Sequence, residues 1–202
     1  MAQHIHDRVI TVEIDLPVWE RFFTVAPLVL IGTREETNRY DIAPKHMAIP
    51  MGWENYFGFV CTPRHRTYRN ILRDGAFTVT YPRATQMVLA SLAAAPRCGE
   101  DDKPSLMALS TFPATRVDGV LVEEGYIFLE CLLDRIIDGF GENSLVAGRI
   151  VAAHVHEDAL RASDRDDQEI IHRAPLMAYL YPGRTAQIDH SYTFPFPIDF
   201  KC

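Results

Sequence analysis

DIAPKHMAIPMGWENYFGFVCTPRHRTYRN, residues 41–70, decides the fold of this chain. Ile42–Ile49 and Tyr56–Thr62 are rich in β-branched and aromatic residues and are bounded by Gly and Pro, so both are predicted to be strands. They lead into residues 63–73, PRHRTYRNILR, which carry four arginines and one histidine but no acid. This basic cluster is unusual in a chain whose formal charge is −7.

The basic cluster contains a predicted short helix. Its apolar residues repeat at helical spacing, Thr67 can cap the first turn and Asp74-Gly75 offers a stop, which predicts a helix over about 68–73. A helix N-terminus presents unpaired N–H groups, so an anion beside Thr67 would meet its hydroxyl, nearby guanidinium groups and the Asn70 amide. The alternative is a plain N-cap with solvated arginines, and residue types alone favour that alternative.

Length and composition narrow the class of protein. A chain of 202 residues with 48% hydrophobic content predicts one domain, with a core over about 20–180 and an extended arm over 182–202. No apolar run approaches the ~18 residues of a membrane span and no signal peptide is evident, so we expect a cytoplasmic protein without a membrane partner. The acidic balance argues against nucleic acid as a partner. The scattered cysteines are expected to be reduced thiols: Cys61, Cys98, Cys131 and Cys202.

The remaining sequence predicts a mainly β protein, a β-barrel with short helices. Strands are predicted over residues 27–33, 76–81, 120–137 and 144–156, with Gly125 marking a turn or bulge. A helix is predicted over 84–95, a loop over 96–105, partial helix over 155–173, and a strand followed by an extended arm at the C-terminus. A barrel is favoured because a doubly wound sheet would need a helix between most strands.

The order of these segments resembles the flavin reductase-like domain, the FMN-binding split-barrel family that includes flavoredoxins. The resemblance covers roughly residues 25–155, and residues 175–184 are similar to a closing PL-x-YL-x-GR segment. No single motif is strong, but their order and spacing together are fairly specific. The matching runs are PLVLIGT, IAPKHM, YFGFVCTPRHRTYRNI, GAFTVTY, LECLLDRI and LVAGRIVAAHV.

This resemblance implies a place for each part of FMN. The isoalloxazine and ribityl chain would lie along the strand formed by Ala43, Pro44, Lys45, His46, Met47 and Ala48. Backbone contacts to the ring edge would come from Cys61 and Thr62, and the phosphate would be bound by Arg66, Thr67 and Asn70. FAD or riboflavin could replace FMN. The sequence departs from the family pattern at Asp41, where Asn is common, and at His46, where Ser is common.

The resemblance implies redox chemistry carried by the cofactor. The sequence shows no motif that would combine a nucleophile, a general base and a residue that orients the base, so no residue is assigned a catalytic role. We expect an NAD(P)H-dependent flavin reductase, in which hydride passes from C4 of NADH or NADPH to N5 of the flavin. A partner oxygenase could then receive the reduced FMN. The alternative is a non-enzymatic, flavoredoxin-like FMN electron carrier, and an oxidase of the pyridoxamine-phosphate type is a weaker third. Residues that could meet the second substrate are Arg97, Lys103, Tyr192 and Phe194, although ordinary loop roles are favoured.

The sequence also suggests an oligomeric state and roles for the remaining histidine, tryptophan and cysteine residues. The resemblance implies a homodimer, and the aromatic C-terminal arm is expected to pack across it through Tyr192, Phe194, Phe196 and Phe200. We expect no metal site, although two groups of residues each resemble half of one. These are His4 with His6, and His154 and His156 with Glu157 and Asp158. Trp19 and Trp53 are expected to pack in the core or an interface, and Cys61 to act as a small hydrophobe.

Overall fold

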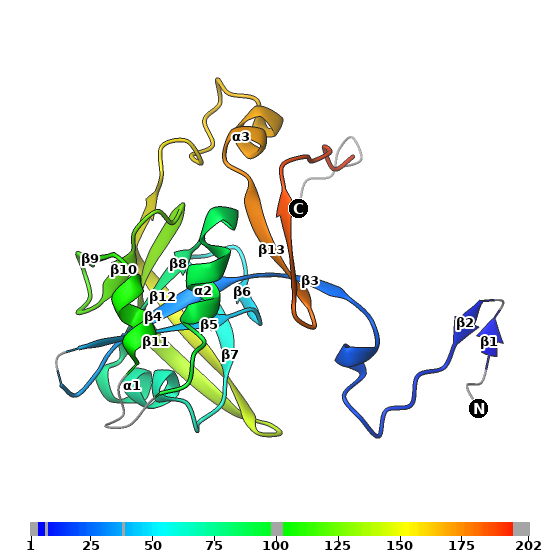
Figure 1. The fold of residues 1–202 in the computed structure, drawn as a ribbon, viewed down its shortest axis with the longest axis horizontal. Helices are drawn as coiled ribbons and strands as arrows, with labels where there is room; N and C mark the ends of the chain where they lie inside the picture. Colours follow the sequence, from blue (N-terminus) through cyan, green and yellow to red (C-terminus); the bar gives the residue numbers. More distant parts are fainter. Residues whose placement is uncertain (1–3, 7, 38, 98–102, 196–202) are drawn as a thin grey trace.

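A curled sheet of seven strands forms the centre of the fold (Figure 1). The computed structural model describes residues 4–6, 8–37, 39–97 and 103–195. Neighbouring strands of the sheet are antiparallel and follow the order β5-β4-β8-β11-β12-β7-β6. Their bounds are β4 Val29–Arg34, β5 Tyr40–Lys45, β6 Ala48–Pro50, β7 Tyr56–Cys61, β8 Ala76–Tyr81, β11 Ile127–Phe140 and β12 Asn143–Val155.

The two outermost strands of this sheet are consecutive in the sequence. β5 ends at Lys45 and β6 begins at Ala48, so two residues, His46 and Met47, link opposite edges of the sheet. Three Cα–Cα steps span at most about 11 Å, so the sheet must curl until its edges nearly meet. The predicted split barrel is confirmed. The single strand predicted over 42–49 is wrong, because the pairing breaks where the chain crosses this seam.

The core fills the inside of the curl. Phe57, Phe59 and Phe77 are almost fully buried, and the rings of Phe59 and Phe77 meet edge to face with centroids 5.4 Å apart. Cys61 and Cys131 are buried free thiols in the same cluster, as expected of small hydrophobes. The other two cysteines, 98 and 202, lie outside the described residues.

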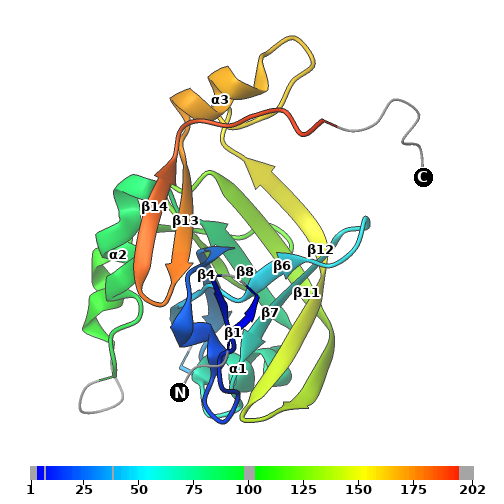
Figure 2. The ribbon, with the colours of Figure 1, turned by 90° about the vertical axis from the view of Figure 1, so that its right-hand side faces the viewer.

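A second, three-stranded sheet closes one side of the molecule. Its order is β14-β13-β3, with bounds β3 Thr24–Pro27, β13 Leu176–Tyr181 and β14 Arg184–Ile188. Figure 2 shows the β13–β14 hairpin beside α2. The arm predicted to extend from residue 182 is therefore wrong over its first part, because Gly183 adopts φ +81° and turns the chain back into a strand.

The main helices are short and lie at the ends of strands. α1 spans Arg66–Asp74, α2 Met87–Leu92 after the 3-10 turn η2 Ala84–Gln86, and α3 Asp167–Arg173. α1 begins two residues earlier than predicted, with His65 at the N-cap position, so Thr67 lies inside the helix instead of capping it. The predicted stop at Gly75 is confirmed, since its N–H donates to the Ile71 carbonyl at 2.8 Å in a left-handed conformation.

The strand predicted over 120–137 divides at Gly125. β10 spans Val120–Val122 and pairs with β9, Thr111–Pro113, before the chain turns into β11. A Cβ atom at Gly125 would approach Thr80 Cγ2 to 2.5 Å, so the turn needs glycine there. The turn predicted at this position is confirmed. A further 3-10 turn, η4 Pro104–Ala108, follows the undescribed residues 98–102.

The N-terminal segment projects from the body of the molecule (Figure 1). It contains a small hairpin, β1 His4–His6 and β2 Val9–Ile10, and the 3-10 turn η1 Val18–Arg21. Trp19 is 53% exposed and Trp53 is fully exposed in the β6–β7 loop, so the expectation that both pack is wrong within this chain. No helix of the described residues is long and apolar enough to cross a membrane.

Candidate functional site

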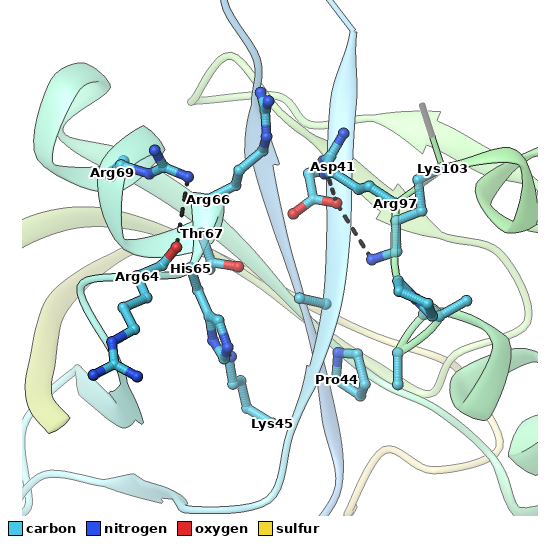
Figure 3. Close-up of a pocket in the computed structure, with 15 residues that line it drawn as sticks. Asp41, Pro44, Lys45, Arg64, His65, Arg66, Thr67, Arg69, Arg97 and Lys103 are labelled. Carbon is cyan, nitrogen blue, oxygen red and sulfur yellow. Dashed lines mark hydrogen bonds and ion pairs between the residues drawn. The ribbon is translucent and has the colours of Figure 1, made fainter. Parts of the chain in front are cut away.

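A basic cavity of about 480 Å³ lies between β5, the start of α1 and the segment after α2 (Figure 3). Six Lys or Arg side chains line it against a single acid. The fold thus brings the basic cluster onto the Ala-Pro strand, as the resemblance implies. The lining residues are Asp41, Ala43, Pro44, Lys45, Arg64, His65, Arg66, Thr67, Arg69, Ala93, Ala94, Ala95, Pro96, Arg97 and Lys103.

The first turn of α1 has no side-chain cap. His65 occupies the N-cap position with an extended backbone, but its side chain accepts no hydrogen bond from the helix. Thr67 is buried and lines the cavity, and no acid stands in the first turn. The partial positive charge of the helix N-terminus is therefore left for an external anion, which such a position favours.

Two cations of the cavity have no carboxylate within 4.0 Å among the described residues. Lys45 Nζ lies 3.3 Å from His65 Nδ1, which must accept because an ammonium group only donates. Arg69 donates to the Arg64 carbonyl oxygen at 3.5 Å. Arg64 differs, since its guanidinium lies 2.6 Å from the exposed Glu142 carboxylate. Lys45 and Arg69 are therefore the cations best able to bind an anionic ligand.

Arg97 and Lys103 line the cavity across β5 from α1 and are paired with acids (Figure 3). Asp41 is buried and lies 3.0 Å from the Arg97 guanidinium and 3.4 Å from Lys103 Nζ. Arg97 also contacts the buried Glu35 at 2.5 Å. Burial lowers the pKa of Lys103, although Asp41 opposes that shift. The carboxylate that replaces the family's common Asn thus balances two cations that we expected to meet a second substrate.

Asn70 does not reach the cavity. Its amide nitrogen donates to Thr33 Oγ1 at 3.0 Å, and its amide oxygen accepts from Arg73 at 3.3 Å. Asn70 is buried one turn into α1, where it faces β4 and not the open helix end. Of the three residues assigned to the phosphate, the structure therefore brings Arg66 and Thr67 together at the cavity and holds Asn70 apart.

A second, mainly apolar cavity of about 660 Å³ adjoins the first, and both are lined by Pro44 and Ala94. The first cavity is cationic, and its neighbour is mainly apolar. The second cavity is lined by Leu28, Pro44, His46, Met87, Val88, Ala90, Ser91, Leu92, Ala94, Tyr179, Gly183 and Thr185.

His46 borders the apolar cavity with an unsatisfied nitrogen. Its ring packs on Tyr179 and Tyr181 of β13, with centroids 4.6 and 5.4 Å away. Nε2 is buried and has no hydrogen-bond partner among the described residues. Burial, reinforced by Lys45, lowers the pKa of His46 and keeps its imidazole neutral at pH 7. A buried nitrogen without a partner is costly, so this position fits a ligand that completes it.

Other residues assigned to the ring lie farther from these cavities. Met47 is exposed and Ala48 is buried, and neither lines the two cavities. Cys61 is buried beneath His65, with Sγ 4.0 Å from Nδ1, and burial raises the pKa of its thiol. Thr62 also lines neither cavity. The donor set nevertheless suits FMN, because an open helix N-terminus with cations matches a phosphate, and a mainly apolar cavity with an imidazole nitrogen that is unpartnered among the described residues matches the ring.

The remaining candidate residues whose side chains the structure describes line neither of the two cavities. Tyr192 and Phe194 lie in a separate cavity beside α3. His154 Nε2 lies 3.0 Å from Glu130, and His156 Nδ1 lies 2.7 Å from Asp158. Within the described residues no three His, Cys, Asp or Glu side chains converge as metal ligands. The side chains of the two N-terminal histidines, and the aromatic residues at 196 and 200, lie outside the described part of the chain.

Sequence reasoning missed the aromatic pair that packs on His46. Tyr179 and Tyr181 alternate along β13, so both can face the same side of the strand. They belong to the closing segment whose resemblance to the family was noted, but no role followed from it. Their alternate spacing was the available signal.

Comparisons with known proteins agree with this geometry. The family model named "Flavin reductase like domain" matches residues 22–185. No curated protein sequence matches this chain significantly. Among solved structures, flavoredoxin of Desulfovibrio vulgaris (Miyazaki F) has a TM-score of 0.75 with 22% identity, covering 92% of this chain and 97% of that chain.

Two further structures share the fold. The 2-nitrobenzoate 2-nitroreductase of Pseudomonas fluorescens has a TM-score of 0.74 with 18% identity, covering 88% of this chain and 87% of that chain. An FMN-binding protein from Thermus thermophilus has a TM-score of 0.73 with 18% identity, covering 91% and 97%. The strand order, the two adjoining cavities and the match over residues 22–185 lead to one assignment. This chain belongs to the flavin reductase-like domain family.

Proposed function

We propose that this protein is an FMN-binding oxidoreductase of the NAD(P)H-dependent flavin reductase type. The observation that carries the proposal is that the basic cavity at the uncapped α1 N-terminus adjoins the apolar cavity, since Pro44 and Ala94 line both. A bound FMN supplies a ring that accepts hydride at N5. The chain's own part is to bind, orient and shield that ring, which explains why no catalytic side chain is required.

The phosphate end of FMN is assigned to the basic cavity. Lys45 and Arg69 have no carboxylate partner among the described residues, and Thr67 adds a hydroxyl beside the open helix end. Arg66 lines the same cavity, 3.9 Å from Glu35. Each charge-assisted hydrogen bond to a phosphate contributes about 1.5–3 kcal/mol, so these groups distinguish FMN from riboflavin, which lacks the phosphate.

This assignment is tested by titrating FMN and riboflavin against Lys45→Met and Arg69→Met and following flavin fluorescence. We expect each variant to weaken FMN binding by at least about tenfold and riboflavin binding by less than about threefold. Arg64→Met is the matched control, because its guanidinium already pairs with exposed Glu142. Equal losses for both ligands would place the phosphate elsewhere, and no binding of any flavin to the wild type would remove the proposal.

The use of NADH or NADPH is tested by anaerobic mixing with the flavin-loaded protein. We expect the flavin absorbance to bleach rapidly with at least one of the two nucleotides. Bleaching by dithionite verifies that the bound flavin is redox-active. A flavin that bleaches with dithionite but with neither nucleotide contradicts the reductase assignment.

A second candidate function is an FMN electron carrier that does not use a nicotinamide. It is favoured by the pairing of Arg97 and Lys103 with Asp41 and Glu35, which leaves these cations less available for a nucleotide phosphate. The same mixing experiment separates the two functions. A carrier exchanges electrons with a reduced redox protein while remaining unreactive toward both nucleotides.

The homodimer remains a proposal of the same kind. Residues 189–191 lie against α3 of their own chain, where Gln168 Oε1 accepts from the Ser191 N–H at 2.7 Å and hydroxyl at 2.9 Å. The part of the arm available to a second subunit therefore lies beyond Ser191. Truncation after Ser191 should weaken the dimer measured by light scattering, and an unchanged dimer with full flavin content contradicts a role for the arm.

A further inference from the structure

His46 occupies the seam of the split barrel. It is the first of two residues that cross from β5 at one edge of the seven-stranded sheet to β6 at the other. Met47, the second, still accepts a backbone hydrogen bond from Val60 at 2.8 Å. The interruption in pairing therefore falls at His46, whose side chain borders the apolar cavity.

The His46 ring is held in place by its neighbours. The Tyr181 ring lies nearly parallel to it, with an interplanar angle of 23°, and the Tyr179 ring is closer but tilted by 32°. Rings packed in this way have few alternative orientations, because rotation of one forces the others to move. The imidazole is thus presented in a defined orientation, although Nε2 gains no hydrogen bond from it.

The surrounding cavity offers little to satisfy that nitrogen. Its lining is mostly Leu, Met, Val, Ala and Pro side chains, and one of its hydroxyls, Thr185 Oγ1, lies 2.9 Å from Met87 sulfur. A ligand here needs an apolar body and a polar edge. The isoalloxazine ring has both, since its pyrimidine edge carries carbonyl acceptors and an N–H donor. Either tautomer of a neutral imidazole can pair with such an edge.

We propose that His46 is a cofactor-binding residue whose Nε2 forms a hydrogen bond with the polar edge of the isoalloxazine ring. The inference rests on the proposed flavin function and adds a residue that this chain has in place of the family's common Ser. The longer imidazole extends from the barrel seam into the apolar cavity, and the tyrosines of β13 fix its direction. The ring is held by His46, whereas the phosphate is held by the basic cavity.

The experiment compares three ligands with the same ring: lumiflavin, riboflavin and FMN. His46→Phe keeps an aromatic ring on the tyrosines but removes both nitrogens. We expect it to weaken all three ligands by the same factor, roughly tenfold, because the lost hydrogen bond is common to them. Lys45→Met, by contrast, weakens FMN alone. Ile49→Val is the control, since this exposed side chain of β6 lines neither cavity.

The reduction potential of bound FMN gives a second readout that a purely structural role would not move. A hydrogen bond that Nε2 donates to a ring carbonyl stabilises the electron-rich reduced ring, whereas one that it accepts from the ring N–H disfavours it. His46→Phe should therefore shift the midpoint potential, downward if Nε2 donates and upward if it accepts, and His46→Gln should restore much of the original value. Unchanged lumiflavin affinity together with an unchanged potential in His46→Phe overturns the proposal. If the wild type binds none of the ligands, the flavin function itself fails, which is a different outcome.

Folding of the variants is checked by thermal unfolding without ligand. His46→Phe removes an unpartnered buried nitrogen, so the ligand-free variant should be at least as stable as the wild type. If it does not fold, His46→Gln decides the case, because its amide can both donate and accept. Affinity for lumiflavin within about threefold of the wild type supports the assignment, and a tenfold loss in a folded His46→Gln protein counts against it.

Discussion

Glu130 and His46 are two polar side chains in the same barrel with opposite surroundings. Glu130, in the middle of β11, is 0% exposed. Its carboxylate accepts hydrogen bonds of 2.5–3.1 Å from the backbone N–H groups of residues 115–117 and from the Thr115 hydroxyl, and His154 Nε2 lies 3.0 Å away. His46 Nε2 has no partner among the described residues.

The difference separates a polar centre that stabilises the fold from one that we propose receives a ligand. Burial alone would raise the pKa of Glu130, but the hydrogen bonds from Thr115, His154 and Arg116 outweigh it and lower the pKa to about 2. The loop before β10 is thereby fixed onto β11. Glu130 has its hydrogen bonds completed by the chain itself, whereas His46 Nε2 lacks, among the residues described, a partner that a ligand could supply.

Glu130→Gln should produce the largest change in stability. The amide loses the charge and offers one acceptor oxygen to five donors, so we expect a loss of roughly 2–3 kcal/mol in the free energy of unfolding. Urea unfolding at pH 7 measures it. His154→Gln is the matched control and should cost less than about 1 kcal/mol, because His154 is partly exposed. A loss below about 0.5 kcal/mol for Glu130→Gln would show that the carboxylate does not organise the loop.

Low pH should remove the stabilisation that the ionised Glu130 carboxylate provides. The pKa of Glu130 is lower in the folded state than its ordinary value of 4.5, so its stabilisation is present above pH 4.5 and is lost as the pH falls toward about 2. The difference in unfolding free energy between wild type and Glu130→Gln should narrow by about 2 kcal/mol between pH 6 and pH 3. Urea unfolding of both proteins across this range measures it. A constant difference contradicts the shifted pKa.

Asn70→Ala should have the smallest effect on stability. It tests whether Asn70 stabilises the fold, as Glu130 does, or contacts a ligand, as we propose for His46. Its amide hydrogen bonds to Thr33 and Arg73 are internal, so we expect a loss of about 1 kcal/mol in stability. The ratio of FMN to riboflavin affinity should stay unchanged. Titration of both flavins measures this ratio, with Arg69→Met as the reference that changes it. A selective loss of FMN affinity in Asn70→Ala would return this residue to the phosphate site.

The fold could be predicted because its signals are local. Strand-like runs bounded by Gly and Pro follow one another along the chain, and their order carried the resemblance to the family. The break at His46 could not be predicted, because IAPKHMAIP reads as one continuous strand and the crossing between sheet edges is a property of the closed barrel. The exposure of Trp53 could not be predicted either, because a hydrophobic side chain is not always buried by its own chain.

The candidate site was predictable in part. Arg66 and Thr67 follow from the motif, and the structure brings both to the cavity. Asn70 follows from the same motif, but one helical turn rotates it toward β4, which depends on where α1 begins. The contact between the rings of Tyr179 and His46 joins positions 133 residues apart (179 − 46). Such contacts arise from tertiary packing, and no local pattern specifies them.

Pro44 has a consequence for association between molecules. It lies in β5, an outer strand of the seven-stranded sheet, and borders both cavities. Exposed sheet edges attract further strands and so promote aggregation. Proline has no N–H to donate, so an added strand could not complete a regular ladder along this edge. Pro44, which lines both cavities, thus also makes this edge of the barrel a poor template for strand addition.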